Sequence, residues 1–233
     1  MTAAVLEFEG VSKAYGGLRP LRIASLRVAA GDRVAMLGFD QPTAEVFVNL
    51  ATGATLPDAG EVRIFGRATR AIDDSADWLA TVDRFGIVSE RAVLLEALTV
   101  IQNLAMPFTL EIEPPPDAVR TRAEALAREV GLDEAAWSVR VAALDAAGWL
   151  RVRLGRAIAL APRILLLEHA SAKLPRGEVA ALGAQLRAVA AARGIALIAL
   201  TADELFAKAV AERVLTLEAS TGVLKPRRRG WFE

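Results

Sequence analysis

AMLGFDQPTAEVFVNLATG, residues 35–53, runs from an apolar strand through a glycine into an amphipathic helix that closes at Thr52 and Gly53. A strand, a glycine turn and a helix in this order are the setting in which backbone N–H groups and one lysine hold a phosphate. This stretch contains no lysine. The question is therefore whether the loop binds phosphate by other means or has lost that task.

Composition describes an ordinary globular chain. Its 233 residues suit one large domain, and 54% of them are hydrophobic. Lys plus Arg and Asp plus Glu both number 28, so no overall charge favours nucleic acid as a partner. The absence of cysteine excludes disulfides, thiolate metal sites and a cysteine nucleophile. We expect neither a signal peptide at MTAAVLEFEG nor an apolar run of the ~18 residues that span a membrane.

The first half of the chain predicts strands and a helical insertion. Residues 5–15 and 21–37 alternate apolar and polar side chains like strands of a half-exposed sheet, with Gly31 and Asp32 as the turn between two of them. Short strands follow at GEVRIFG and FGIVS. A helix at LTVIQNLAMPF stops near Pro107, and another starts at Asp117 and stops at Gly131. These two helices predict a peripheral helical subdomain.

From residue 144 onward, helices alternate with strands of continuous apolar residues. The strands are RILLLE, IALIAL and RVLTLE, and the helices between them include RGEVAALGAQLRAVAAARG and ADELFAKAVA. Such runs are typical of a parallel sheet that is covered on both faces.

The order of elements resembles the nucleotide-binding domain of ABC transporters over essentially the whole chain. Gly38 to Gly53 matches the length of the family's GxxGxGK[ST]TLxxxLxG stretch, and LDAAGWLRVRLGRAIALAPRILLLEHASAKLP aligns without a gap with LSGGQxQRxxxARAL…PxxLLLDEPTSxLD. The resemblance implies an α/β, P-loop NTPase-like ABC ATPase fold. Its mostly parallel sheet is flanked by helices, with an N-terminal antiparallel β subdomain. Residues 1–233 then form a single domain with a helical subdomain at about 90–150.

The phosphate-binding positions of that family are substituted here. Gln41 and Thr43 stand at two glycine positions, Ala44 at the lysine and Glu45 at the Ser or Thr that binds Mg²⁺. Pro42 removes one N–H, and Glu45 places a carboxylate where the phosphate is expected. These changes replace attraction for phosphate with repulsion.

The residues also have a purely structural interpretation. Thr43 can cap the helix, Glu45 in the first turn suits the helix dipole, and Val46, Phe47 and Leu50 form an apolar stripe facing the sheet. We favour this interpretation over a new phosphate site.

The remaining catalytic positions implied by the resemblance are substituted as well. Glu168 stands at the Mg²⁺-associated aspartate, His169 at the glutamate that activates water, and Ser89 at the Q-loop glutamine. Pro175 replaces the D-loop aspartate and Ala202 the switch histidine. His169 is interpreted as a structural residue at a strand end, although a histidine can act as a base near neutral pH. We expect no catalytic residue, no metal and no cofactor.

The signature LSGGQ has become LDAAG at residues 144–148. Tyr15 survives at the position of the aromatic residue that stacks on adenine, but a single tyrosine after a strand is more often a packing residue. The residual cofactor-binding positions are Tyr15, Gly38, Thr43, Ala44 and Glu45.

Three functions follow from the resemblance. The first is a catalytically inactive subunit that docks on a membrane permease at the inner face of the cell membrane, as a homodimer or paired with an active ABC ATPase. LTVIQNLAMP is similar to ATPases of lipid or lipoprotein export systems. The second is a divergent ATPase that binds ATP and Mg²⁺ and uses Tyr15, Glu168 and His169. The third is a soluble scaffold without a permease.

The docking hypothesis makes its own residue predictions. The family's groove for a permease helix matches residues 89–108, an apolar run that equally suits packing of the subdomain onto the sheet. The basic tail, residues 225–229, is a second candidate surface. The candidate groove residues are Arg91, Val93, Leu94, Leu95 and Leu98.

Overall fold

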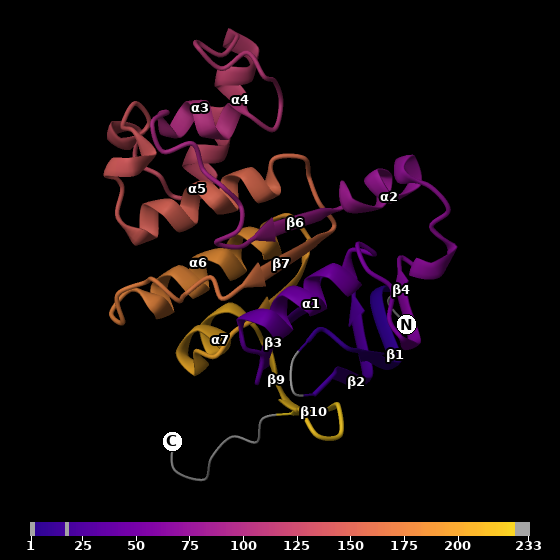
Figure 1. Ribbon diagram of the computed structural model, residues 1–233. Coiled ribbons are helices and arrows are strands. Elements are labelled where there is room, and N and C mark those ends of the chain that lie inside the picture. The colour runs from indigo at the N-terminus through magenta and orange to yellow at the C-terminus, as the bar shows by residue number, and fades with distance from the viewer. Residues whose placement is uncertain (1–2, 17–18, 227–233) are drawn as a thin grey trace.

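The computed structural model describes residues 3–16 and 19–226, and two sheets organise them (Figure 1). The larger sheet has the strand order β10-β9-β3-β8-β7-β6, and its five strands from β9 to β6 run parallel. Its strands are β3 (Arg33–Leu37), β6 (Phe85–Val88), β7 (Ile164–Glu168), β8 (Ala196–Leu200), β9 (Arg213–Glu218) and β10 (Val223–Pro226). This is the mixed, mostly parallel sheet that the sequence predicts.

Alternate side chains of the central strands enter two different cores. Val34 and Met36 of β3 pack toward helix α1 (Gln41–Ala51) and the antiparallel sheet. Ala35 and Leu37 pack on the opposite face, against α5 (Ala146–Ile158), α6 (Val179–Ala192) and α7 (Glu204–Val210). Because both faces of the sheet are covered, apolar and polar residues do not alternate along these strands.

The smaller, antiparallel sheet has the order β2-β1-β4-β5. Its strands are β1 (Ala4–Lys13), β2 (Leu21–Ala29), β4 (Ala59–Ile64) and β5 (Arg67–Ala68). One prediction needs correction: Gly31 and Asp32 do turn the chain, but β2 and β3 lie in different sheets. Alternation cannot distinguish these cases, because sheet membership depends on pairing with distant strands.

Helices fill the interval between β6 and β7, at the upper end of Figure 1. They are α3 (Val100–Ala105), α4 (Asp117–Glu129), the short 3₁₀ turns Glu134–Ala136 and Val141–Ala143, and α5. Thr99 and Gln102 close a capping box on α3, and Gly131, at φ 75°, follows the end of α4.

Helix α2 and the short strands β5 and β10 were not predicted. Helix α2 (Ser75–Val82) has no buried residue, and β5 and β10 are only two and four residues long. A 3₁₀ turn, Thr69–Ala71, precedes α2. Within the described part of the chain, no helix is both long and apolar enough to cross a membrane.

Candidate functional site

The loop between β3 and α1 is closed by its own side chains. Asp40, not Thr43, is the N-cap of α1: its carboxylate accepts the N–H of Thr43 at 2.9 Å. The Thr43 hydroxyl and N–H hold the pKa of Asp40 below its usual value, and the charge of His169 adds a smaller effect. Glu45 is likewise outside the first helical turn, which holds no acidic residue. Both sequence predictions about the helix start are therefore corrected, because the helix begins earlier, at Gln41.

Phe39 fixes this loop to the core. Its side chain is 1% exposed and meets the Phe47 ring edge-on, with ring centroids 5.7 Å apart. Phe47 in turn stacks on Phe8 of β1 at 4.9 Å. Gly38 adopts φ 90°, where a Cβ would lie 3.0 Å from the Leu217 carbonyl oxygen. The turn is therefore packed like a core segment, and the Phe39 ring fills the space on its inner side.

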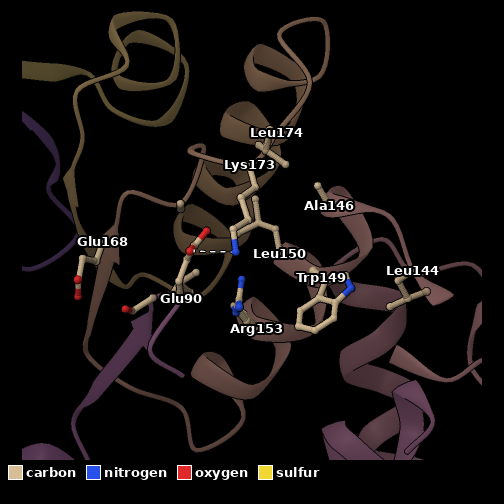
Figure 2. Close-up of a pocket in the computed structure, with 12 residues that line it drawn as sticks. Glu90, Leu144, Ala146, Trp149, Leu150, Arg153, Glu168, Lys173 and Leu174 are labelled. Carbon is tan, nitrogen blue, oxygen red and sulfur yellow. Dashed lines mark ion pairs between the residues drawn. The ribbon is translucent and has the colours of Figure 1, made fainter. Parts of the chain in front are cut away.

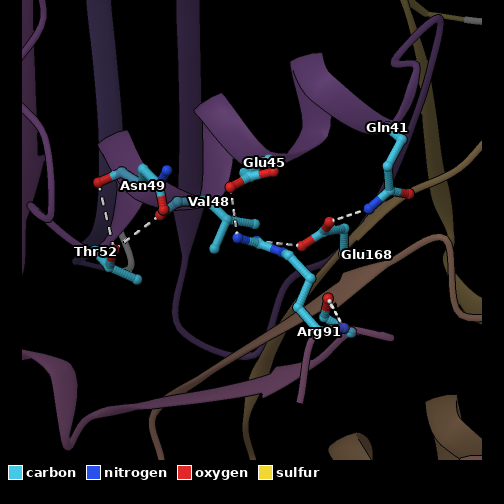
Figure 3. A network of polar contacts seen from close by, with 8 residues as sticks. Gln41, Glu45, Val48, Asn49, Thr52, Arg91 and Glu168 are labelled. Carbon is cyan, nitrogen blue, oxygen red and sulfur yellow. Dashed lines mark hydrogen bonds and ion pairs between the residues drawn. The ribbon is translucent and has the colours of Figure 1, made fainter. Parts of the chain in front are cut away.

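A guanidinium joins two acidic residues of the site, Glu45 and Glu168 (Figure 3). Arg91 Nη2 lies 2.6 Å from Glu168 Oε2, and Arg91 Nη1 lies 3.0 Å from Glu45 Oε1. Gln41 Nε2 donates to the other Glu168 oxygen at 2.5 Å. We call Gln41, Glu45, Arg91 and Glu168 the Arg91 network. The Glu168 side chain is 0% exposed, so the network satisfies both oxygens of a fully buried carboxylate.

The other predicted catalytic positions lie around this network. Ser89 is buried, and its Oγ accepts the Arg91 backbone N–H at 3.1 Å. His169 follows β7 with φ 47°, and its Nε2 is buried without a hydrogen-bond partner in the described structure. Ala202 is exposed between β8 and α7. Because Nε2 of His169 is shielded from solvent, it is not placed to take a proton from a water nucleophile in this structure.

Tyr15 reaches the same loop from the end of β1. Its hydroxyl lies 3.0 Å from Thr43 Oγ1, so the two hydroxyls share a hydrogen bond. Ala44 is 0% exposed. The structure therefore brings Tyr15, Gly38, Thr43, Ala44 and Glu45 together around one loop, where they contact protein groups.

A cavity of about 260 Å³ opens beside Glu168 (Figure 2). Glu90 and Lys173 form an ion pair of 3.1 Å at this cavity, and the Arg153 guanidinium lies over the Trp149 ring, 5.4 Å from its centroid. Arg153 Nε is buried and has no hydrogen-bond partner in the described structure. The positive charge of Arg153 is thus held by an aromatic face and not by a paired carboxylate.

A second cavity of about 380 Å³, here called the groove, lies between β6, α5 and the end of α3. Gly86 and Ala157 bring β6 and α5 together there: a Cβ on Gly86 would lie 2.4 Å from the Ala157 carbonyl oxygen. The groove is lined by Val82, Asp83, Phe85, Gly86, Ile87, Ala92, Leu94, Met106, Pro107, Arg153, Arg156, Ala157, Leu160 and Pro162.

Of the five residues predicted for partner binding, only Leu94 lines the groove, and it is itself 4% exposed. Val93 is 73% exposed and Leu95 39%, whereas Leu98 is half-buried and outside the groove. Arg91 lies outside the groove, and its charge is engaged by Glu45 and Glu168, so its part in partner binding stays a prediction.

The basic tail predicted as a second surface, residues 225–229, is only partly described. Lys225 pairs with Glu218 at 2.9 Å, and residues 227–229 lie outside the described residues.

Sequence reasoning missed Phe39, Asp40 and the bridging role of Arg91. One signal was available for Arg91. Replacing a lysine by Ala44 and a hydroxyl by Glu45 leaves two carboxylates, Glu45 and Glu168, without a cation. A buried carboxylate requires one, so a nearby arginine was the residue to look for.

Comparisons with known proteins agree on the family. The lipoprotein-releasing system ATP-binding protein of Maricaulis maris is 31% identical over 220 residues, which span 93% of this chain and 95% of that protein. The methionine import ATP-binding protein of Brucella abortus is 28% identical over 218 residues, but the chain spans only 58% of its length. No protein-family model matches the chain.

Solved structures show the same fold. A dimeric bacterial ABC transporter cassette superposes with a TM-score of 0.76 at 22% identity, covering 97% of this chain and 100% of that one. The cbiO1 subunit from Clostridium perfringens gives 0.80 at 19% identity, over 95% of this chain and 87% of that one. With a 31% identical relative matched over nearly its whole length, the chain belongs to the ATP-binding cassette family of ABC transporters.

Proposed function

We propose that this chain is a catalytically inactive ABC transporter subunit, which keeps the cassette fold and docks on a membrane permease without using ATP. It would lie at the inner face of the membrane, as a homodimer or with an active ATPase as its dimer partner. The observation that carries the proposal is the Arg91 network, in which a guanidinium bridges the acidic residues at the two metal-associated positions.

The loop residues do not fit a magnesium-bound phosphate. A phosphate-binding loop needs free N–H groups and a cation aimed at the ligand. Here the N–H of Thr43 is used by Asp40, Pro42 has no N–H, and Ala44 supplies no charge. Asp40 at the N-cap and Glu45 in the second turn of α1 add negative charge near this loop. Their repulsion of a polyphosphate opposes binding.

Arg91 provides internally the charge that a metal would otherwise bring. Its contacts of 2.6 Å to Glu168 and 3.0 Å to Glu45 fall within the range of charge-assisted hydrogen bonds and close ion pairs. A divalent cation would have to displace this guanidinium before reaching Glu168. Phosphoryl transfer depends on metal and cation positioning, so the loss of both leaves the site without its main means of catalysis.

The groove supports the docking part of the proposal. Its walls are largely apolar and include Leu160, which follows the end of α5 and is 55% exposed. Apolar anchors with a few charges are typical of a groove that receives an amphipathic helix. One relative is named as part of a lipoprotein-releasing system, and this supports a lipid or lipoprotein export permease as the partner class.

The names of the relatives favour a second candidate, a divergent subunit that still binds ATP. Tyr15 beside the loop is consistent with it. A hydrolysis assay with magnesium separates the two candidates. We expect no turnover above background. A rate within tenfold of an intact family member, abolished by His169→Ala, would establish the divergent enzyme instead.

Docking is tested with a matched pair of leucines. Leu160→Ser changes an exposed side chain that lines the groove, and Leu110→Ser changes one that is 92% exposed and lies outside it. Co-sedimentation with membranes carrying the candidate permease should fall for Leu160→Ser and stay unchanged for Leu110→Ser. Burying one leucine contributes roughly 1.5–3 kcal/mol, so a loss of about tenfold or more is expected. Equal binding by both variants would reject the groove.

A further inference from the structure

The groove contains two arginines that the chain itself does not pair. Arg153 and Arg156 both line it, and neither forms an ion pair with a carboxylate among the described residues. Arg156 Nη1 donates to the Val93 carbonyl oxygen at 2.7 Å, and its other donors have no partner among the described protein groups. Arg153 Nε is buried without any partner. Buried polar groups are normally satisfied, so the unsatisfied Nε of Arg153 points to a group that is missing from the isolated chain.

Partial burial disfavours the charged form of both arginines in the free chain. Desolvation lowers the pKa of Arg153 and of Arg156 from the ordinary arginine value, although an arginine stays charged at any physiological pH. The carboxylate that acts on Arg153 is Glu90, which is already paired with Lys173 at 3.1 Å. Asp83 also lines the groove, after the end of α2. The rest of the lining is largely apolar.

We infer that the partner segment seated in the groove carries a carboxylate that pairs with Arg153 and Arg156, while its apolar side chains pack on Leu94, Met106 and Leu160. This inference rests on the proposed docking function and specifies the chemistry of the partner: an amphipathic helix with an apolar stripe and an acidic residue beside it. A planar guanidinium binds a carboxylate through two parallel hydrogen bonds, so the pair also fixes the register of the helix.

Pairing of a partner carboxylate with Arg153 would also affect the cavity beside Glu168. Arg153 lines both the groove and the cavity beside Glu168, where Figure 2 shows it below the Glu90–Lys173 ion pair. A carboxylate arriving from the groove side would therefore compete with Glu90 for the same cation. Docking would therefore alter the contacts of Glu90, which lies with Ser89 at this cavity and directly precedes Arg91 in the chain.

The test uses the purified full chain and three synthetic amphipathic peptides. They share leucines at positions i, i+3, i+4 and i+7 and differ at one neighbouring position, which is Glu, Gln or Lys. Binding is measured by fluorescence anisotropy at low and high salt. We expect the Glu peptide to bind about tenfold more tightly than the Gln peptide, the Lys peptide to bind most weakly, and salt to reduce the difference.

Arg153→Met and Arg156→Met should remove the preference for the Glu peptide, and Arg153→Lys should keep part of it. Arg187→Met, on α6 and outside the groove, is the control and should keep all of it. Arg153→Met should also melt no lower than the parent, because it removes a buried donor that has no partner. A merely structural Arg153 would instead lower the melting temperature when replaced.

Equal affinity for all three peptides, no binding by any of them, or a preference that survives in the double variant would overturn the inference. These results are distinct from failure of the proposed function. If Leu160→Ser still weakens membrane binding while the peptides show no charge preference, docking stands and the carboxylate pairing is wrong. If ATP is hydrolysed while the preference is present, the pairing stands and the inactive subunit is wrong.

Discussion

Glu168 is a fully buried carboxylate held between an amide and a guanidinium. Arg91→Met should destabilise the fold, because it leaves this charge without its cation. Breaking a buried pair costs about 3–5 kcal/mol, and we expect a loss near 3 kcal/mol because Arg91 is 41% exposed and water can enter. Urea unfolding at neutral pH measures the change.

The matched control is Glu45→Gln, which removes the outer partner of the same arginine. Glu45 is 46% exposed, and exposed pairs contribute roughly 0–1 kcal/mol. Arg91→Lys should lie between the parent and Arg91→Met, because an ammonium keeps the charge but not the forked geometry. Equal effects of Arg91→Met and Glu45→Gln would show that Glu168 does not depend on Arg91.

Asp40 makes a pH-dependent contribution at the start of α1. Its pKa is lowered in the folded chain by the Thr43 hydroxyl and N–H, so its contribution is fully present above the unfolded pKa and is lost as the pH falls through the folded pKa. Asp40→Ala should cost about 0.5–2 kcal/mol near neutral pH. Asp40→Asn keeps a capping side chain without a charge.

Unfolding curves of the parent and Asp40→Asn between about pH 3 and 7 test this contribution. The advantage of the parent should shrink below about pH 4, where the unfolded carboxyl of ordinary pKa is protonated. A difference that stays constant over the whole range would mean that Asp40 caps the helix without its charge.

Helix α1 cannot accept a lysine at the position where phosphate-binding loops carry one. Ala44 is 0% exposed, so Ala44→Lys forces a long charged side chain against packed neighbours. We expect a loss of about 1–3 kcal/mol and no gain of ATP binding, because Asp40, Pro42 and Glu45 remain. Ala188→Lys, at an exposed position of α6, should change stability by less than about 0.5 kcal/mol. Tight ATP binding by Ala44→Lys would show that only the charge had been missing.

Periodicity predicted most elements because their side chains repeat with the faces they cover. The runs ILLLE of β7 and ALIAL of β8 are apolar throughout, since helices cover one face and α1 with the antiparallel sheet covers the other. Helix α2 left no such signal, because none of its residues is buried. The start of α1 was misplaced because Asp40 and Thr43 are both good capping residues, and only the backbone decides between them.

The fold of the chain was predictable from its sequence, and the internal contacts of the site were predictable only in part. Spacing from Gly38 to Gly53 and the aligned run from Leu144 to Pro175 were enough for the architecture. The sequence indicated that Glu45 and Glu168 need a cation but did not identify Arg91 as that cation, because the members of the Arg91 network come from α1, the segment after β6 and the end of β7. Contacts between such distant positions depend on the three-dimensional arrangement and leave no local pattern.

We propose that a folded cassette persists here without a usable nucleotide site. The most direct test is the melting temperature of the purified chain with and without millimolar ATP and magnesium. A ligand at a hundred times its dissociation constant stabilises by about 2.7 kcal/mol, which corresponds to roughly 5–10 °C for a chain of this size. We predict a shift within experimental error. A rise of several degrees that depends on both ATP and magnesium would show that the site still binds nucleotide.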